Sequence, residues 1–190
     1  MNLIKDKDFD QIIDQNDTLR KTKKIPLDLI KSIHKISDNF TTRIYGKQVK
    51  PIAAILKTLS KKIPEKNFPG DNILHPDRYL PNIKIFFYPD AVEENGAPFM
   101  FSVESHKITK NYLNFFVNSK NNVFDETNFE SSEFLKNKQL FPVKENSLIV
   151  ACTNGFHGRA KFTSKQDRTA IVLTFSNFKM SSLISSFSLR

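Results

Sequence analysis

Thr169-Ala170-Ile171-Val172-Leu173-Thr174-Phe175 is an apolar run of strand length near the end of the chain, and it is rich in β-branched residues. Similar runs occur earlier in the second part of the sequence, at Ile83–Tyr88, Pro98–Val103 and Ser147–Thr153. Turn-forming sequences separate them, namely Glu93-Glu94-Asn95-Gly96, Asn118–Asn122 and Asn154-Gly155. The pattern predicts a set of antiparallel strands arranged as a small double-sheet barrel or jelly roll.

The first third of the chain has helical spacing instead. Pro26 is followed by apolar residues at Leu27, Ile30, Ile33 and Ile36, which predicts a helix with proline near its first turn. A second helix is expected between Pro51 and Ile63, because its apolar residues share one face and Lys57, Lys61 and Lys62 face away. Residues 1–24 are expected to be a polar, poorly ordered or weakly helical arm, and residues 125–140 a short helix over the sheet.

These patterns together predict a mainly β protein with N-terminal α-helices. Residues 1–66 are expected to form a helical region that packs on the core, and residues 67–190 the β core itself. At 190 residues the chain has the length of one domain.

The composition narrows the function classes. Hydrophobic residues make up 39% and charged residues 26% of the chain, as in globular proteins, and no run of about 18 apolar residues predicts a membrane span. The sequence Met1–Asp8 is charged where a signal peptide would be apolar. A single cysteine, Cys152, cannot form an internal disulfide. We therefore expect a protein of the reducing cytoplasm.

The net charge of +9 is concentrated in residues 1–70, which hold fifteen basic and eight acidic side chains. A basic surface of this kind binds nucleic acid or acidic lipid head groups in some proteins. In many others it is a lysine-rich helical surface in contact with water, which is the interpretation that we favour here.

His75-Pro76-Asp77 is the first group of residues that carries chemistry. It lies between a turn and a strand, and in an extended segment residues two apart point to the same face. His75 and Asp77 therefore aim an imidazole and a carboxylate at one point, as a metal ion requires. The alternative is a turn in which Asp77 caps a backbone amide.

His157 and Arg168 form the second group. His157 lies in Asn154-Gly155-Phe156-His157-Gly158, where the glycines permit a tight turn after an apolar strand. Arg168 follows eleven residues later and enters the last apolar strand. A buried arginine there is costly unless it binds an anion, and its planar fork suits a carboxylate. The alternative is an exposed arginine at a strand edge.

In this order, the two groups are typical of a facial triad of two histidines and one carboxylate. Such a triad leaves positions open on non-haem Fe(II) for a chelating cosubstrate and O₂. Ser105 and His106 are interpreted as structural, and His34 as a surface residue.

Three pieces of the sequence resemble the phytanoyl-CoA dioxygenase-like family of Fe(II)/2-oxoglutarate oxygenases, over about residues 73–176. The first is His75-Pro76-Asp77 with Lys84-Ile85-Phe86-Phe87-Tyr88 after it. The second is the turn at Asn95-Gly96 with Ser105-His106-Lys107, and the third is Ser147-Leu148-Ile149-Val150 with His157 and Arg168. The resemblance implies a double-stranded β-helix (jelly-roll, cupin-like) core.

The resemblance also implies the roles of the residues. His75, Asp77 and His157 would bind Fe(II), and Arg168 would hold the distal carboxylate of 2-oxoglutarate. Lys84 or Ile85 occupies a strand position that faces the cosubstrate in relatives. Because relatives that halogenate lack the carboxylate of Asp77, its presence implies hydroxylation or a related oxidation. The resemblance also implies O₂ and a small-molecule substrate as partners, with succinate and CO₂ released. No catalytic residue beyond the metal centre is implied.

The chain departs from the family pattern in two ways. Glu104 stands where relatives have glycine, so the turn there must form without positive φ or with strain. The region before His75 is short, which motivates a second hypothesis, a non-catalytic jelly-roll relative that acts as a binding module. A third hypothesis, nucleic-acid binding by residues 20–66, has no recognised motif behind it. The oligomeric state and the substrate are not predicted.

Overall fold

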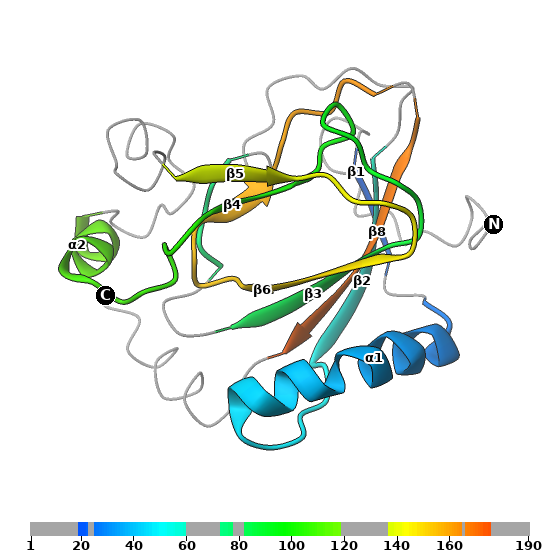
Figure 1. Cartoon of the computed structure of the whole chain (residues 1–190), viewed down its shortest axis with the longest axis horizontal. Coiled ribbons are helices and arrows are strands. Elements are labelled where there is room, and N and C mark those ends of the chain that lie inside the picture. Colours follow the sequence, from blue (N-terminus) through cyan, green and yellow to red (C-terminus); the bar gives the residue numbers. More distant parts are fainter. Residues whose placement is uncertain are drawn as a thin grey trace.

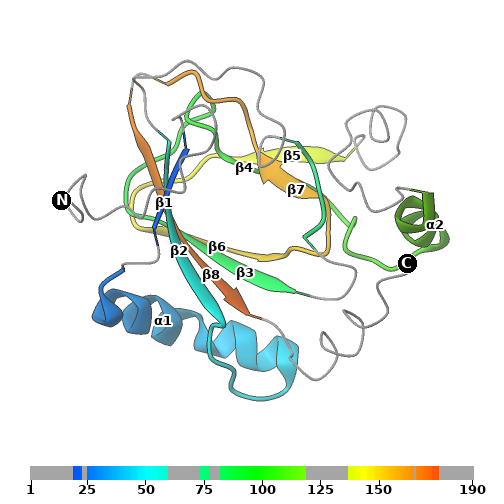
Figure 2. The same ribbon diagram turned by 180° about the vertical axis from the view of Figure 1, so that it is seen from behind.

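Two antiparallel sheets face each other, and a long helix lies beneath the larger one (Figures 1 and 2). The computed structural model describes residues 19–22, 25–59, 73–77, 82–118, 137–164 and 166–175. The larger sheet has the strand order β1 (Leu19–Thr22), β2 (Ala53–Leu59), β8 (Arg168–Phe175), β3 (Ile83–Tyr88) and β6 (Ser147–Cys152). The smaller sheet has the order β5 (Lys138–Phe141), β4 (Phe99–Ser102) and β7 (His157–Arg159).

The outer face of the larger sheet packs against helix α1 (Leu27–Tyr45). Alternate strand residues point outward because the side-chain period of a strand is two. Ile85 and Leu173 lie opposite each other on neighbouring strands, are fully buried, and belong to one apolar cluster with Ile33 of α1. Burial of this face supplies the main hydrophobic stabilisation of the larger sheet.

The inner face of the larger sheet points toward the smaller sheet. Phe86 and Val172 are register partners on β3 and β8, and they cluster with Phe99 of β4. The rings of Phe86 and Phe99 have their centroids 4.8 Å apart, so the two sheets touch directly at this point. The core between the sheets is therefore aromatic and narrow.

The four strands predicted from apolar runs are confirmed, with ends that agree within one residue. The mainly β fold and the helix after Pro26 are also confirmed. The helix predicted for residues 51–63 is wrong, because residues 53–59 form β2 and pair with β8 from Ala53↔Thr174 to Leu59↔Arg168. The pairing of a whole strand with β8 outweighs the helical spacing of the apolar residues. Residues 60–63 lie outside the described residues.

The expectation of a polar arm fails at Leu19–Thr22, which form β1 and pair with β2. Residues 1–18 and 23–24 of that arm lie outside the described residues. Since β1 and β2 both precede residue 66, the larger sheet contains segments from both sides of the predicted boundary at that residue.

Helix α2 (Lys110–Asn118) is not predicted from the sequence. It is anchored by Tyr112, which is fully buried and donates a hydrogen bond from its hydroxyl to the carbonyl of Asn154 at 2.9 Å. The helix predicted within residues 125–140 falls mostly outside the described residues, and residues 138–140 of it belong to β5 instead. The predicted turn at 118–122 also lies mostly outside the described residues. Only Asn118 is described, and it is the last residue of α2.

The turn after β4 contains Glu104 at the position where relatives have glycine. The φ of Glu104 is 68°, so a non-glycine residue occupies the left-handed region there. The sequence allowed a turn without positive φ or a strained one. The turn has positive φ, and it is therefore the strained one. Glu104 also accepts a hydrogen bond from Lys107 at 2.6 Å, which helps to hold this turn.

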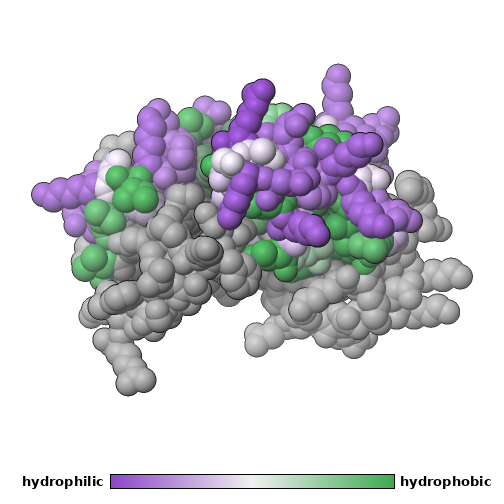
Figure 3. Space-filling model, turned by 90° about the horizontal axis from the view of Figure 1, so that it is seen from below, coloured by the Kyte–Doolittle hydropathy of each residue, from purple (hydrophilic) through white to green (hydrophobic). Residues whose placement is uncertain are grey.

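The described part of the face that α1 covers is mostly hydrophilic, with hydrophobic side chains between the hydrophilic ones (Figure 3). Ile36 and Phe40 are among these exposed apolar residues of α1. Within the described part of the chain, neither helix is long and apolar enough to cross a membrane.

Candidate metal centre

The backbone brings the two predicted histidines together. His75 and His157 form an isolated antiparallel bridge, in which each amide donates to the carbonyl of the other, at 2.8 and 3.0 Å. Asp77 is held by its own amide, which donates to the carbonyl of Thr153 at 2.8 Å. The segment of residues 73–77 is therefore fixed against the chain around β7 by main-chain hydrogen bonds.

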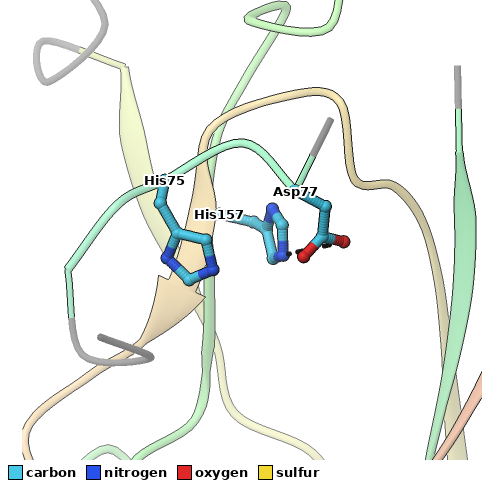
Figure 4. A group of neighbouring side chains, drawn as sticks. All are labelled: His75, Asp77 and His157. Atoms are coloured by element: carbon cyan, nitrogen blue, oxygen red, sulfur yellow. Dashed lines mark ion pairs between the residues drawn. The ribbon is translucent and has the colours of Figure 1, made fainter. Parts of the chain in front are cut away.

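The side chains of His75, Asp77 and His157 lie side by side (Figure 4). One ligand atom from each lies within 4.8 Å of the others, and both histidines are buried. His157 Nε2 is 3.7 Å from Asp77 Oδ2. The expected juxtaposition of an imidazole and a carboxylate two residues apart is confirmed, and the second imidazole joins them through the bridge between strands.

Hydrogen bonds fix the tautomer of each ring. His75 Nδ1 is 2.8 Å from the carbonyl oxygen of Ile73, and His157 Nδ1 is 2.9 Å from that of Gly155. Because a carbonyl oxygen only accepts, Nδ1 carries the hydrogen in both rings and Nε2 carries the lone pair. Histidines that bind a metal through Nε2 usually donate their Nδ1–H to a hydrogen-bond acceptor of this kind.

Burial and charge set the protonation of the group. Burial lowers the pKa of His157 to about 4, so this imidazole is neutral near pH 7, as a metal ligand must be. Burial opposes ionisation of Asp77, but its neighbours outweigh that effect and hold the pKa of its carboxyl below the usual value. Since His157 is neutral, the ammonium of Lys84 is the neighbour that carries the compensating charge.

Lys84 reaches Asp77 from β3. Its Nζ lies 2.6 Å from both Oδ1 and Oδ2 of the carboxylate, and the two side chains are only 20% and 17% exposed. The sequence left open whether Lys84 or Ile85 faces the cosubstrate. Lys84 lines the cavity, whereas Ile85 is buried on the opposite face of β3. The contact with a predicted metal ligand was not expected from the sequence.

A cavity of about 40 Å³ lies between the sheets beside this group. It is lined by the two histidines, by apolar side chains that include Phe86 and Val172, and by four cationic residues, Lys57, Lys84, Arg159 and Arg168. Among the described residues that line it, none is Asp or Glu. The cavity therefore suits an anion, and its volume is that of a few water molecules at most.

Arg168 lies at the end of the cavity away from the histidines. Lys84 pairs with Thr174 of β8. Arg168 lies six residues before Thr174, at the start of the same strand and on the same face. Arg168 is buried, its Nη2 donates to the hydroxyl of Tyr88 at 3.2 Å, and its Nε has no hydrogen-bond partner. The alternative of an exposed strand-edge arginine is therefore excluded.

Sequence reasoning missed three residues around the cavity. Tyr88 is fully buried and its ring lies 5.3 Å from the guanidinium carbon of Arg168. Lys57 lines the cavity, whereas the predicted helix had turned it toward solvent. Arg159, to which the sequence assigned no role, is buried against the same cavity. The spacing of two residues from His157 to Arg159 is the one local signal available, because it puts both on one face of a strand.

The remaining residues of the motifs have structural roles. Ser105 is buried, and its hydroxyl accepts a hydrogen bond from the amide of Phe156 at 2.8 Å, as expected for a structural residue. Gly155 is needed for close packing, because a Cβ there would lie 2.6 Å from the ring of Phe101. His34 is half-buried rather than a surface residue, and its Nε2 donates to the carbonyl of Val49 at 2.8 Å.

Comparison with solved structures finds this fold in several proteins of low sequence identity. EctD from S. alaskensis with bound Fe has a TM-score of 0.61 at 13% identity, over 92% of this chain and 62% of EctD. The epimerase SnoN, in complex with Fe³⁺, α-ketoglutarate and nogalamycin RO, has a TM-score of 0.61 at 9% identity, over 83% and 63%. HygX from Streptomyces hygroscopicus, with nickel, 2-oxoglutarate and hygromycin B bound, has a TM-score of 0.55 at 12% identity, over 90% and 74%.

These likenesses show that the chain shares the jelly-roll fold of these structures. The chain spans less than two thirds of the length of SnoN and of EctD. No protein-family model and no curated protein matches the sequence.

Proposed function

We propose that this protein is an Fe(II)- and 2-oxoglutarate-dependent oxygenase that hydroxylates a small molecule. The observation that carries the proposal is a buried group of two imidazoles and one carboxylate, with ligand atoms within 4.8 Å, at one end of a cavity whose other end holds a buried arginine. The fold, which it shares with proteins that bind iron and 2-oxoglutarate, supports the same function.

The donor set fits a divalent iron ion. Two neutral imidazole Nε2 atoms and a carboxylate on one side of a cavity are the ligands of the facial triad, and the opposite side stays open. His75, Asp77 and His157 would hold the metal. Each imidazole already donates Nδ1–H to a backbone carbonyl, so the rings need no reorientation to present Nε2.

Arg168 and Tyr88 would bind the distal carboxylate of 2-oxoglutarate. Arg168 Nε is buried without a partner, and a carboxylate is the group that best satisfies an arginine in such a place. The hydroxyl of Tyr88 orients the guanidinium by accepting from Nη2. Phe86 and Val172 line the space between the two ends and exclude water from it.

Iron with 2-oxoglutarate and O₂ supplies the oxidation, in which the cosubstrate becomes succinate and CO₂ and a C–H bond of the substrate becomes C–OH. The residues of this chain hold the three ligands in place, leave the facing positions open and anchor the cosubstrate at its far end. The small cavity implies that side chains move when the cosubstrate enters, because 40 Å³ is less than a five-carbon dicarboxylate occupies.

The test is anaerobic visible spectroscopy of the purified protein with Fe(II), before and after 2-oxoglutarate. We expect a weak charge-transfer band that requires both, because chelation of a protein-held iron by the oxo acid produces it. His157→Ala is expected to weaken metal binding by more than about a hundredfold, beyond the effect of losing an outer-shell partner. Metal affinity in His157→Ala and Asp77→Ala equal to that of the unaltered protein would contradict the proposal.

A second candidate function is a binding module without turnover. It is favoured by the ion pair of Lys84 with Asp77, which gives the carboxylate a counter-charge without a metal. Succinate formation that depends on added iron and 2-oxoglutarate, at a rate well above that of free iron, would exclude this function. Membership in the phytanoyl-CoA dioxygenase-like branch and a cytoplasmic location stay predictions from the sequence.

A further inference from the structure

We propose that Lys84 is the counter-ion of Asp77 in the metal-free protein, that a bound metal displaces it, and that the displaced ammonium then binds an anionic group of the cosubstrate. Lys84 thereby couples metal binding to anion binding. This inference rests on the proposed function.

The first step is the geometry of the ion pair. Lys84 Nζ lies 2.6 Å from both oxygens of Asp77, so the ammonium occupies the side of the carboxylate that a metal ligand must present. His157 Nε2 approaches the same carboxylate at 3.7 Å. A dication held by His157 and Asp77 would therefore meet the ammonium of Lys84 at close range, where like charges repel strongly.

The second step is why the pair exists without metal. Asp77 is mostly buried, and a buried carboxylate without a counter-charge is costly. Lysine suits a temporary counter-ion, because its ammonium is a point charge on a flexible four-carbon stem. Arginine would bind the two oxygens in a fixed fork and would be harder to displace.

The third step is where the ammonium goes. Lys84 lines the cavity, on the same face of β3 as Phe86 and Tyr88. Swinging away from Asp77 keeps it in that cavity, at the opposite end from Arg168. A dicarboxylate between the two ends would then have one cation near each carboxylate, which matches the charge of 2-oxoglutarate.

The experiment measures two affinities in each variant by calorimetry, with Ni(II) as a redox-stable probe. Lys84→Met is expected to bind Ni(II) about tenfold more tightly or better, because one unit charge beside the dication is removed. In the Ni(II)-loaded protein the same variant is expected to bind 2-oxoglutarate about tenfold more weakly, because a charge-assisted hydrogen bond is lost. The two effects have opposite signs, which a general loss of structure cannot produce.

Lys57→Met is the matched control. It removes the same charge from the same cavity, but Lys57 pairs with Ala170 near the Arg168 end and does not contact Asp77 in any hydrogen bond or ion pair that we observe. Its Ni(II) affinity is expected to change by less than about threefold, because repulsion between charges falls with their separation and Lys57 pairs four residues further from the Lys84 position along β8. Lys84→Arg keeps the charge and is expected to bind Ni(II) no more tightly than the unaltered protein. Lys84→Gln replaces Lys84→Met if the latter does not fold.

The outcomes separate this inference from the proposed function. If the unaltered protein binds no Ni(II), or binds it independently of His157, the proposed function fails and this inference fails with it. If it binds Ni(II) through His157 but Lys84→Met and Lys84→Gln gain no affinity, only the exchange of counter-ions is overturned. Equal gains of Ni(II) affinity in Lys57→Met and Lys84→Met also overturn it. The gain would then come from the total positive charge of the cavity and not from the contact of Lys84 with Asp77.

Discussion

The two faces of the larger sheet differ in what their side chains do, although the same strands supply both. On the outer face Ile85 and Leu173 are fully buried and belong to the apolar cluster with Ile33 of α1. On the inner face the alternate residues of the same two strands include Lys84 and Arg168, which line the cavity. Because side chains alternate along a strand, the residues that stabilise the sheet and those that line the candidate site lie on opposite faces of the same strands.

The largest effect is expected from an outer-face substitution. Leu173→Ala removes a fully buried side chain at the centre of the cluster with α1, which should lower the free energy of unfolding by about 2–5 kcal/mol. Denaturant unfolding measures this change. Metal affinity of the folded variant should stay within about twofold of the unaltered protein, and a larger loss would show that the two faces are not independent.

The cavity beside the inner face, which His157 lines from β7 of the smaller sheet, should give the protein its pH dependence. The pKa of His157 is about 4 when folded and near 6.5 when unfolded, so the unfolded state takes up the proton first as pH falls. Well above pH 6.5 the imidazole of His157 is neutral in both states and does not affect stability. By pH 4 its protonation in the unfolded state is expected to lower the free energy of unfolding by about 3 kcal/mol.

Unfolding of the metal-free protein with a chelator present, at pH values from 7 to 4, measures this penalty. His157→Gln should flatten the profile over that range, whereas Leu173→Ala should shift it without changing its shape. A slope that His157→Gln leaves intact would assign the pH dependence to other groups. Asp77 acts in a lower range: because its folded pKa is depressed, the stability that it contributes is lost only as pH falls below its ordinary value.

The smallest effect is expected at the far end of the inner face. Tyr88→Phe removes the hydroxyl that accepts from Arg168 but keeps the ring beside the guanidinium. We expect the affinity for 2-oxoglutarate in the metal-loaded protein to fall about tenfold or less, since one hydrogen bond to a charged group is lost. Calorimetric titration with 2-oxoglutarate tests this, with Ni(II) affinity as the control that should not change.

Much of the fold and part of the site were predictable because their signals are local. Apolar, β-branched runs between turn residues located four strands, and the two-residue spacing of His75 and Asp77 put both side chains on one face. The region of β2 was misread because its apolar residues also fit a helical stripe. Its strand state comes from pairing with β8, which lies more than a hundred residues later.

The sequence by itself determined the alternation of apolar and polar residues, the turns, and the order of the residues that can bind a metal. Tertiary structure decided which of them meet. The bridge of His75 with His157 completes the triad, and the register of β3 with β8 puts Tyr88 against Arg168. The contact of Lys84 with Asp77 arises in the same way, from how the strand and the preceding segment are packed. Such contacts join segments whose relative positions depend on sheet pairing and burial, and no local spacing encodes them.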